Sequence, residues 1–168
     1  FARAWHLLGV ILQQRGDTPM AIEHIRRAIS LEPQWPAFYS NLGTIYSSLG
    51  RWAEAEAALR QCLRLSPDST LAMRALGRVL CERNRCDDAV GVFQNAVAVD
   101  SKDAEALGGL AYAYTELGLV EDSLASYRRA SELSPDPIYR VLAATLLPLV
   151  YEAAEDVERW RNRLTREV

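Results

Sequence analysis

The sequence lacks any unbroken run of apolar residues that could cross a membrane, which takes about 18 residues. Its first segment, residues 1–12, also lacks the ordered basic, apolar and small-residue regions of a secretory signal. Of the 168 residues, 49% are hydrophobic and 24% are charged, as in ordinary folded domains. The sequence therefore predicts a soluble protein with a sizeable core, without a membrane partner.

Cysteine is scarce as well. Cys62, Cys81 and Cys86 are an odd number in a chain that is long enough to fold without disulfides, which favours a reducing compartment. We therefore expect a cytoplasmic location. Cys81 and Cys86 flank a predicted turn at a spacing that fits neither a zinc knuckle nor a redox pair, and no histidine lies near them. They are interpreted as free thiols.

An excess of positive charge is absent too, since the formal net charge is −3, and this gives no electrostatic argument for nucleic acid. The only histidines, His6 and His24, lie far apart without cysteine or carboxylate patterns around them. Neither a glycine-rich phosphate loop nor a nucleophile elbow occurs. We predict no catalytic residue, no metal and no cofactor in this segment. Because Ala2 already begins a repeat and the chain does not start with Met, we expect this segment to be a piece of a longer protein with more chain upstream.

What the sequence does contain is a repeated unit. Residues 37–67, AFYSNLGTIYSSLGRWAEAEAALRQCLRLSP, read as two amphipathic helices joined by a tight turn at Gly50. The pattern matches itself when it is shifted by one constant step in either direction. Its landmarks are Tyr39, Leu42, Gly43, Tyr46, Gly50, Ala55, Leu59, Cys62 and Pro67. One step back they become Trp5, Leu8, Gly9, Leu12, Gly16, Ala21, Ile25, Ala28 and Pro33. We predict four repeats, at residues 2–35, 36–69, 70–103 and 104–137.

Local signals support this division. Gly16 is placed to end the first helix in a left-handed conformation, and Asn84 stands at the equivalent position two repeats later. Thr18 is predicted to cap the second helix, and Asp103 to cap the first helix of the fourth repeat. Aromatic residues in repeat columns are expected in the core: Trp5, Tyr39, Tyr46, Phe93 and Tyr127. Trp35 and Trp52 lie outside the columns and are expected to be exposed.

The repeat pattern does not continue after Pro137. One more helix is predicted from Asp136 to about Leu147, followed by an interruption at Pro148. Residues 152–168 then read as a charged amphipathic helix. We interpret residues 138–168 as the cap that a stacked array needs over its last apolar face. The alternative is a linker to another domain.

A period of about 34 residues with these landmarks resembles the tetratricopeptide repeat family, over about 136 residues. The resemblance implies an all-α fold, a right-handed α-solenoid of helix-turn-helix repeats. It also implies that the first helix of each repeat lines a concave groove that binds a protein or an extended peptide. Members of the family usually have no catalytic activity of their own.

The segment from Tyr39 to Gly43 is similar to repeats of O-linked N-acetylglucosamine transferases and their SPINDLY-type bacterial relatives. In those repeats an Asn beside the Leu-Gly pair joins a ladder that grips peptide backbone. Asn41 matches it, whereas Leu7, Ala75 and Gly109 replace it elsewhere. Residues 146–163 are similar to the segment between repeats and glycosyltransferase domain in the bacterial proteins.

The groove-facing polar positions follow from the spacing of the first helices. Arg74 and Arg78 lie one helical turn apart and are a candidate grip for a carboxylate, with solvated surface arginines as the alternative. The full set of candidates for peptide binding is Arg3, His6, Gln13, Ser40, Asn41, Thr44, Ser47, Arg74, Arg78, Glu82, Glu105, Tyr112 and Glu116.

Three functions follow as hypotheses. The first is a scaffold that binds a peptide or protein partner in the groove. The second is a non-catalytic arm that presents substrates to a glycosyltransferase domain of a longer protein. The third is an array that associates with itself through its ends.

Overall fold

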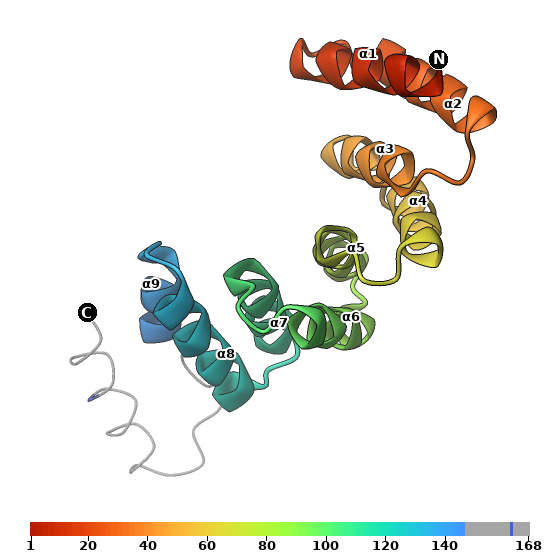
Figure 1. Cartoon of the computed structure of the whole chain (residues 1–168). Helices are drawn as coiled ribbons and strands as arrows, with labels where there is room; N and C mark the ends of the chain where they lie inside the picture. Colours follow the sequence, from red (N-terminus) through yellow and green to blue (C-terminus); the bar gives the residue numbers. More distant parts are fainter. Residues whose placement is uncertain (147–161, 163–168) are drawn as a thin grey trace. The chain divides into compact units, whose positions relative to one another are not determined.

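The computed structural model describes residues 1–146 and residue 162, and these residues contain helices and no strand. Figure 1 shows the helices along the chain. In order they are α1 (Ala2–Gln14), α2 (Thr18–Leu31), α3 (Pro36–Ser48), α4 (Trp52–Leu65), α5 (Thr70–Glu82), α6 (Cys86–Val99), α7 (Ala104–Glu116), α8 (Val120–Leu133) and α9 (Ile138–Thr145).

The helices recur at one fixed spacing. The first helices α1, α3, α5 and α7 begin at residues 2, 36, 70 and 104, and the second helices α2, α4, α6 and α8 begin at residues 18, 52, 86 and 120. Both series advance by the same constant step, which is the period of the sequence pattern. The all-α fold built from helix pairs is thus confirmed for the described residues.

The turn inside each pair has a left-handed residue. Gly16, Gly50 and Gly118 have φ angles of 84°, 68° and 73°, and Asn84 has 55° at the equivalent position. The next backbone N–H then bonds back to the last turn of the first helix, as from Asp17 to the carbonyl of Leu12 at 2.9 Å. The prediction that Asn84 replaces glycine in this turn is confirmed.

The N-terminal cap of α2 differs from the prediction. Asp17, not Thr18, caps α2, because its Oδ1 accepts a hydrogen bond from the N–H of Met20 at 3.3 Å, while Thr18 is the first helical residue. Both side chains are chemically able to cap a helix, so the neighbouring residue types alone did not decide between them. The predicted cap at Asp103 is confirmed, with Oδ1 accepting from the N–H of Ala106 at 2.9 Å.

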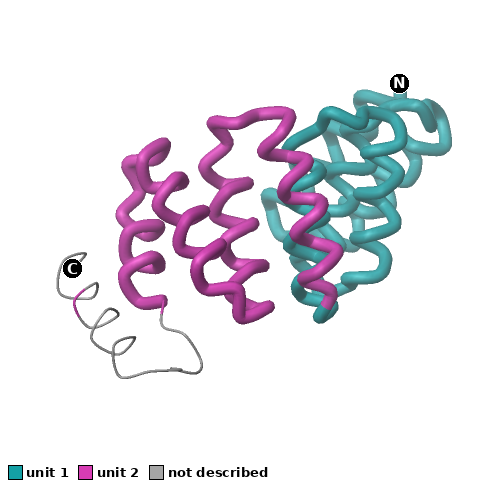
Figure 2. Tube along the Cα trace, turned by 90° about the horizontal axis from the view of Figure 1, so that it is seen from below, with its two compact units in different colours: residues 1–84 teal, residues 85–168 magenta. Residues whose placement is uncertain are grey.

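The chain divides into two compact units, residues 1–84 and residues 85–168 (Figure 2). Within unit 1, the helices of a pair approach closely at a small residue. A Cβ built on Gly43 would lie 2.6 Å from Cγ of Leu59, and one on Gly9 would lie 2.7 Å from Cγ1 of Ile25. These glycines are therefore required by the helix–helix contact rather than by a turn.

Unit 2 contains α6 to α9. Its core joins Ala111, Leu124, Tyr127 and Ala143, so that α9 packs on α8 and covers its apolar face. Ser123 is fully buried there, and its hydroxyl donates to the carbonyl of Ala111 at 2.8 Å. The helix predicted from Asp136 to about Leu147 is thus present as α9. The predicted interruption at Pro148 and, except for residue 162, the predicted helix over residues 152–168 lie outside the described residues.

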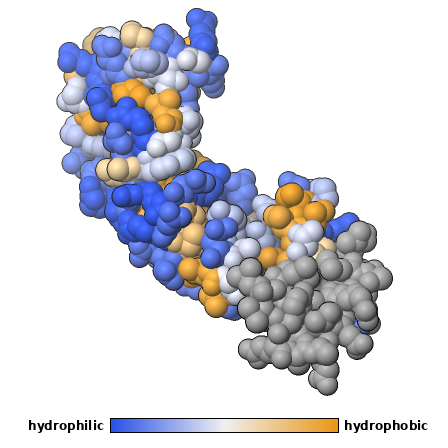
Figure 3. Space-filling model, turned by 180° about the vertical axis from the view of Figure 1, so that it is seen from behind, coloured by the Kyte–Doolittle hydropathy of each residue, from blue (hydrophilic) through white to orange (hydrophobic). Residues whose placement is uncertain are grey.

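Most aromatic residues in the repeat columns are in the core, as expected: Tyr46, Phe93 and Tyr127 are buried and Tyr39 is half-buried. The prediction is wrong for Trp5, whose side chain is exposed. Figure 3 shows hydrophobic side chains gathered in patches on a largely hydrophilic face. No helix of the described residues is both long and apolar enough for a membrane span.

Candidate functional site

A cavity of about 320 Å³ lies between α3 and α5 in unit 1. We call it the α3–α5 cavity. Its lining residues come from the last turns of α3, the first residue of α4 and the second half of α5. They are Thr44, Ser47, Ser48, Trp52, Ala75, Arg78, Val79 and Glu82. Four predicted candidates are therefore brought together here: Thr44, Ser47, Arg78 and Glu82.

The α3 wall presents hydrogen-bond acceptors. The hydroxyl of Thr44 donates to the carbonyl of Ser40 at 3.1 Å, and that of Ser47 donates to the carbonyl of Gly43 at 2.9 Å. Ser48 donates to the carbonyl of Ile45 at 2.8 Å. A hydroxyl has one proton, so each of these oxygens has only lone pairs left for a ligand. The α3 wall thus suits the N–H groups of a bound molecule.

The α5 wall presents a donor, Arg78, and an acceptor, Glu82. Arg78 and Glu82 are exposed and one helical turn apart, and neither forms an ion pair with another residue of the described part. The guanidinium of Arg78 has five N–H donors and fits carbonyl or carboxylate oxygens. Val79 and the half-buried Trp52 supply apolar surface beside these charges. The α3 wall therefore offers acceptors, and Arg78 on the α5 wall supplies a donor across the cavity.

Three further candidates make contacts between α1 and α3. Nδ2 of Asn41 lies 2.7 Å from Nε2 of His6, whose ring packs on Phe38 with a centroid distance of 4.8 Å. The guanidinium of Arg3 lies over the ring of Trp35, 4.0 Å from its centroid. These side chains hold helices together, and His6 engages one of the two amide N–H donors of Asn41.

The remaining candidates are not among the residues that line the α3–α5 cavity. Ser40 is buried, and Gln13 and Arg74 are half-buried. Glu105, Tyr112 and Glu116 are exposed on α7 of unit 2. Of the predicted arginine pair, Arg78 alone lines the cavity.

Trp52 is the largest of the lining residues that sequence reasoning did not place in the site. It was expected to be exposed and is half-buried, at the first residue of α4, where Thr18, Cys86 and Val120 stand in the other second helices. A large aromatic residue in a column of smaller ones was the available signal. Its unusual size was visible in the sequence, but the side of the helix pair on which it lies was not.

Burial is the main cause of the pKa shifts of His6 and Cys62. Burial lowers the pKa of His6 below its ordinary value of 6.5, which favours the neutral ring that accepts from Asn41. Burial raises the pKa of the Cys62 thiol, against smaller opposing hydrogen bonds from Ser69 and the backbone of Ser40. Cys62 is therefore a protonated core residue at neutral pH. In the described part of the chain, no three His, Cys, Asp or Glu residues gather into a candidate metal site.

Comparison with known families gives a consistent result. Family models described as "Tetratricopeptide repeat" match residues 1–68, 36–102 and 74–137. The chain is 30% identical over 120 residues to small glutamine-rich tetratricopeptide repeat-containing protein 2 of Mycosarcoma maydis, covering 71% of this chain and 34% of that protein. It is 32% identical over 92 residues to Hsp70-Hsp90 organizing protein 3 of Arabidopsis thaliana, covering 55% and 16%. The chain thus spans about a third of the first relative and less of the second.

Solved structures share the fold at low identity. MamA from Desulfovibrio magneticus RS-1 superimposes with a TM-score of 0.83 at 20% identity, over 99% of this chain and 92% of that one. YrrB, described as a TPR protein with an unusual peptide-binding site, superimposes with a TM-score of 0.77 at 17% identity, over 99% and 82%. These likenesses establish an α-solenoid of helix pairs.

Proposed function

This chain belongs to the tetratricopeptide repeat family, and from that premise we propose that it is an interaction scaffold whose α3–α5 cavity binds an extended segment of a partner protein. The observation that carries the proposal is the pairing of an acceptor wall on α3 with the donor Arg78 on α5. A peptide backbone offers both donors and acceptors, so one chain between these walls can satisfy both.

The spacing of the hydroxyls supports an extended ligand. Thr44 and Ser48 are four residues apart on α3, which is about 6 Å along a helix at about 1.5 Å per residue. In an extended chain, backbone N–H groups on one side recur every two residues, or about 6.8 Å. Two successive groups on one side of the peptide therefore match these two hydroxyl positions.

The ligand's side chains are constrained by the rest of the lining. Arg78 is placed to take a carbonyl or carboxylate oxygen, and Trp52 with Val79 offers apolar surface for one side chain. A volume of about 320 Å³ is at the lower end for ligand sites, so the cavity takes a short stretch of peptide. The preferred ligand is an extended segment with an apolar residue next to an acidic one.

The test is selection from a displayed library of short peptides, followed by titration calorimetry with the selected sequence. Arg78→Ala is expected to weaken binding by about tenfold or more, as the loss of a charge-assisted hydrogen bond does. Arg64→Ala is the matched control, because Arg64 is exposed on α4 and bonds only to Gln61 among the described residues. Equal affinities for the Arg78 and Arg64 variants would exclude this site.

The glycosyltransferase-arm hypothesis has less support from the described residues. The Asn41 that carries it is hydrogen-bonded to His6, and nearly all of the C-terminal segment that carries it lies outside the described residues. The scaffold function is therefore the one that we propose.

A further inference from the structure

The two charged residues that line the α3–α5 cavity, Arg78 and Glu82, have opposite signs. Both are exposed on α5, one helical turn apart, and among the described residues neither forms an ion pair with the other or with a third residue. Opposite charges at this spacing stabilise a helix best when the acid precedes the base, and here the base precedes the acid. Both charges are therefore available to a ligand.

The α3 wall does not compensate these charges. Thr44 occupies the same position of α3 as Arg78 does of α5, and Ser48 corresponds to Glu82 in the same way. The hydroxyls of Thr44 and Ser48 are neutral and donate to carbonyls of their own helix. Each charge on α5 thus shares the cavity with a neutral hydroxyl at the equivalent position of α3, and a complementary charge has to come from the ligand.

Apolar surface lies deeper in the same cavity. Ala75 and Val79 are only 8% and 2% exposed, and Trp52 is half-buried. Because Arg78 and Glu82 are exposed, the charged groups stand at the rim of the cavity and the apolar groups form its floor. The cavity therefore presents two kinds of surface at two depths.

An extended peptide matches this arrangement. Its successive side chains point to opposite faces, and alternate side chains lie about 6.8 Å apart. Arg78 and Glu82 are four residues apart, which is about 6 Å along the helix axis. When one side chain of the peptide points to the floor, the side chains before and after it are directed to the rim, at the spacing of the two charges.

We propose that the partner segment carries one apolar residue between an acidic and a basic residue, with the acid paired to Arg78 and the base paired to Glu82. This inference rests on the peptide-binding function proposed above and specifies its ligand. Arg78 and Glu82 determine specificity, because a segment with two like charges brings one of them against a residue of the same sign.

The experiment uses four acetylated and amidated peptides with identical Gly-Ser flanks and the cores Glu-Leu-Lys, Lys-Leu-Glu, Glu-Leu-Glu and Lys-Leu-Lys. Both mixed orders are included because an extended peptide can enter the cavity in either direction. Each peptide is titrated into the whole, ¹⁵N-labelled chain, and the indole resonance of Trp52, assigned with Trp52→Phe, is followed. We expect a mixed core to bind about fivefold more tightly than either like-charged core, since an exposed ion pair replaces a like-charge contact. High salt should reduce the difference.

Charge reversal changes the expected ranking in a defined way. Glu82→Arg should prefer Glu-Leu-Glu, and Arg78→Glu should prefer Lys-Leu-Lys. Both residues are exposed, so an unchanged circular dichroism spectrum is expected. The ranking in the wild type needs no variant and tests the proposal by itself.

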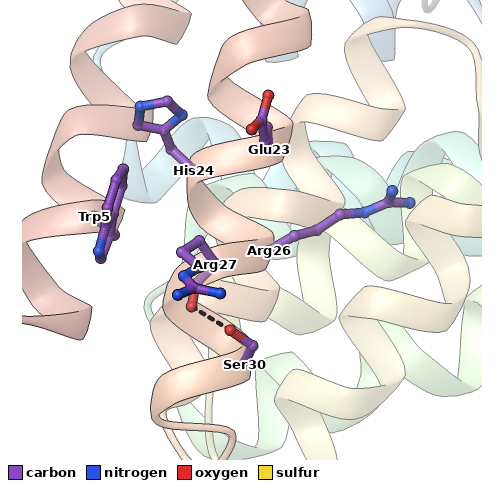
Figure 4. A pocket seen from close by; sticks show the side chains of 6 residues that line it. All are labelled: Trp5, Glu23, His24, Arg26, Arg27 and Ser30. Atoms are coloured by element: carbon purple, nitrogen blue, oxygen red, sulfur yellow. Dashed lines mark hydrogen bonds between the residues drawn. The ribbon is translucent and has the colours of Figure 1, made fainter.

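A second cavity of unit 1, of about 520 Å³, supplies the matched controls (Figure 4). It is lined by Trp5, Glu23, His24, Arg26, Arg27 and Ser30. Glu23 and Arg27 are exposed and one helical turn apart on α2, with the same two charges as the α5 pair. Glu23→Arg and Arg27→Glu change the net charge by the same amounts and should keep the ranking of the wild type.

The inference is overturned if the wild type binds all four peptides equally, or if the α5 variants rank them as the α2 variants do. Equal binding by the wild type, with a loss of affinity in Arg78→Ala, would overturn the charge pattern and leave the proposed function in place. If no peptide, including those selected from the library, shifts the Trp52 resonance, both proposals are overturned.

Discussion

Asn41 on α3 and His6 on α1 are joined by a 2.7 Å contact between the amide Nδ2 and the ring Nε2. Because the amide nitrogen only donates, the ring nitrogen accepts, and His6 is neutral with its proton on Nδ1. The contact links α1 to α3, the first helices of two successive repeats. It uses an amide N–H of Asn41 that could otherwise donate to the backbone of a bound peptide. Asn41 is thus first a structural residue.

The same contact predicts a pH dependence. Burial lowers the pKa of His6 in the folded state below 6.5, so the unfolded chain binds the proton more tightly. The free energy of unfolding should therefore fall as the pH drops from above 6.5 through the folded-state pKa, and level off for this group below it. NMR titration of the His6 ring should give a midpoint below 6.5. His6→Gln should reduce the stability loss on acidification, measured by urea unfolding, and an identical loss in both proteins would contradict the prediction.

Gly43 predicts a destabilising effect of a single methyl group. A Cβ at this position meets Leu59 at 2.6 Å, and overpacking of this kind costs about 1–3 kcal/mol. Alanine's better helix propensity returns about 1 kcal/mol, so Gly43→Ala should lower the free energy of unfolding by up to about 2 kcal/mol. Gly91→Ala is the control, because nothing lies within 4 Å of a Cβ there and α6 should gain about 0.5–1 kcal/mol. Urea unfolding measures both, and the same sign for both variants would refute the argument.

Because the carboxylate of Glu56 is buried, we expect that removing one of its arginine partners lowers the free energy of unfolding. Its carboxylate is buried on α4 and pairs with Arg60 on the same helix and with Arg83 just after α5. Arg83→Ala leaves the buried carboxylate with less compensation and should cost about 1–2 kcal/mol. The exposed Arg64 is the matched control, with an expected change within about 0.5 kcal/mol. Denaturant midpoints at equal slopes decide the comparison, and indistinguishable midpoints would show that Arg60 suffices.

We expect the thiol of Cys62 to react slowly with alkylating reagents in the folded chain. Its side chain is buried and its pKa is raised, so little thiolate exists at pH 8 and reagents reach it poorly. Iodoacetamide followed by peptide mass spectrometry should show Cys62 unmodified in the native chain and modified in urea. Rapid native modification would mean that α4 opens locally. Because thiolate increases with pH, the native rate should also rise between pH 8 and 9.5.

The turns were predictable because their requirement is local. A left-handed backbone after a helix favours glycine or asparagine, so Gly16 and Asn84 reveal the turn without any tertiary information. The cap of α2 was predicted one residue too late, since Asp17 and Thr18 carry equally suitable oxygens and only the backbone path selects one. Trp5 was predicted in the core because its column is buried elsewhere. A column is buried only where a neighbouring helix covers it.

Four of the groove candidates do line one cavity, since the 3.6-residue period of a helix assigns residues to a face. The same period could not reveal which face residues are already engaged. Asn41 bonds to His6 and Arg3 lies over Trp35, and each contact joins residues that lie about one repeat apart in the sequence. Nor did it place Trp52 in the cavity, because that depends on how α4 packs beside α3.

The sequence by itself therefore determined the helices, their repeat period, their turns and the family, because each depends on residues within one repeat. Only the tertiary structure decided which polar groups remain available, as Thr44, Ser47 and Arg78 do around the α3–α5 cavity, and which apolar residues remain open, as Leu8 and Ile11 do on α1. The physical reason is that a side chain is available only where no neighbouring helix covers it. Equivalent positions of the repeats carry similar residue types whether or not they are covered, so the sequence does not distinguish the two cases.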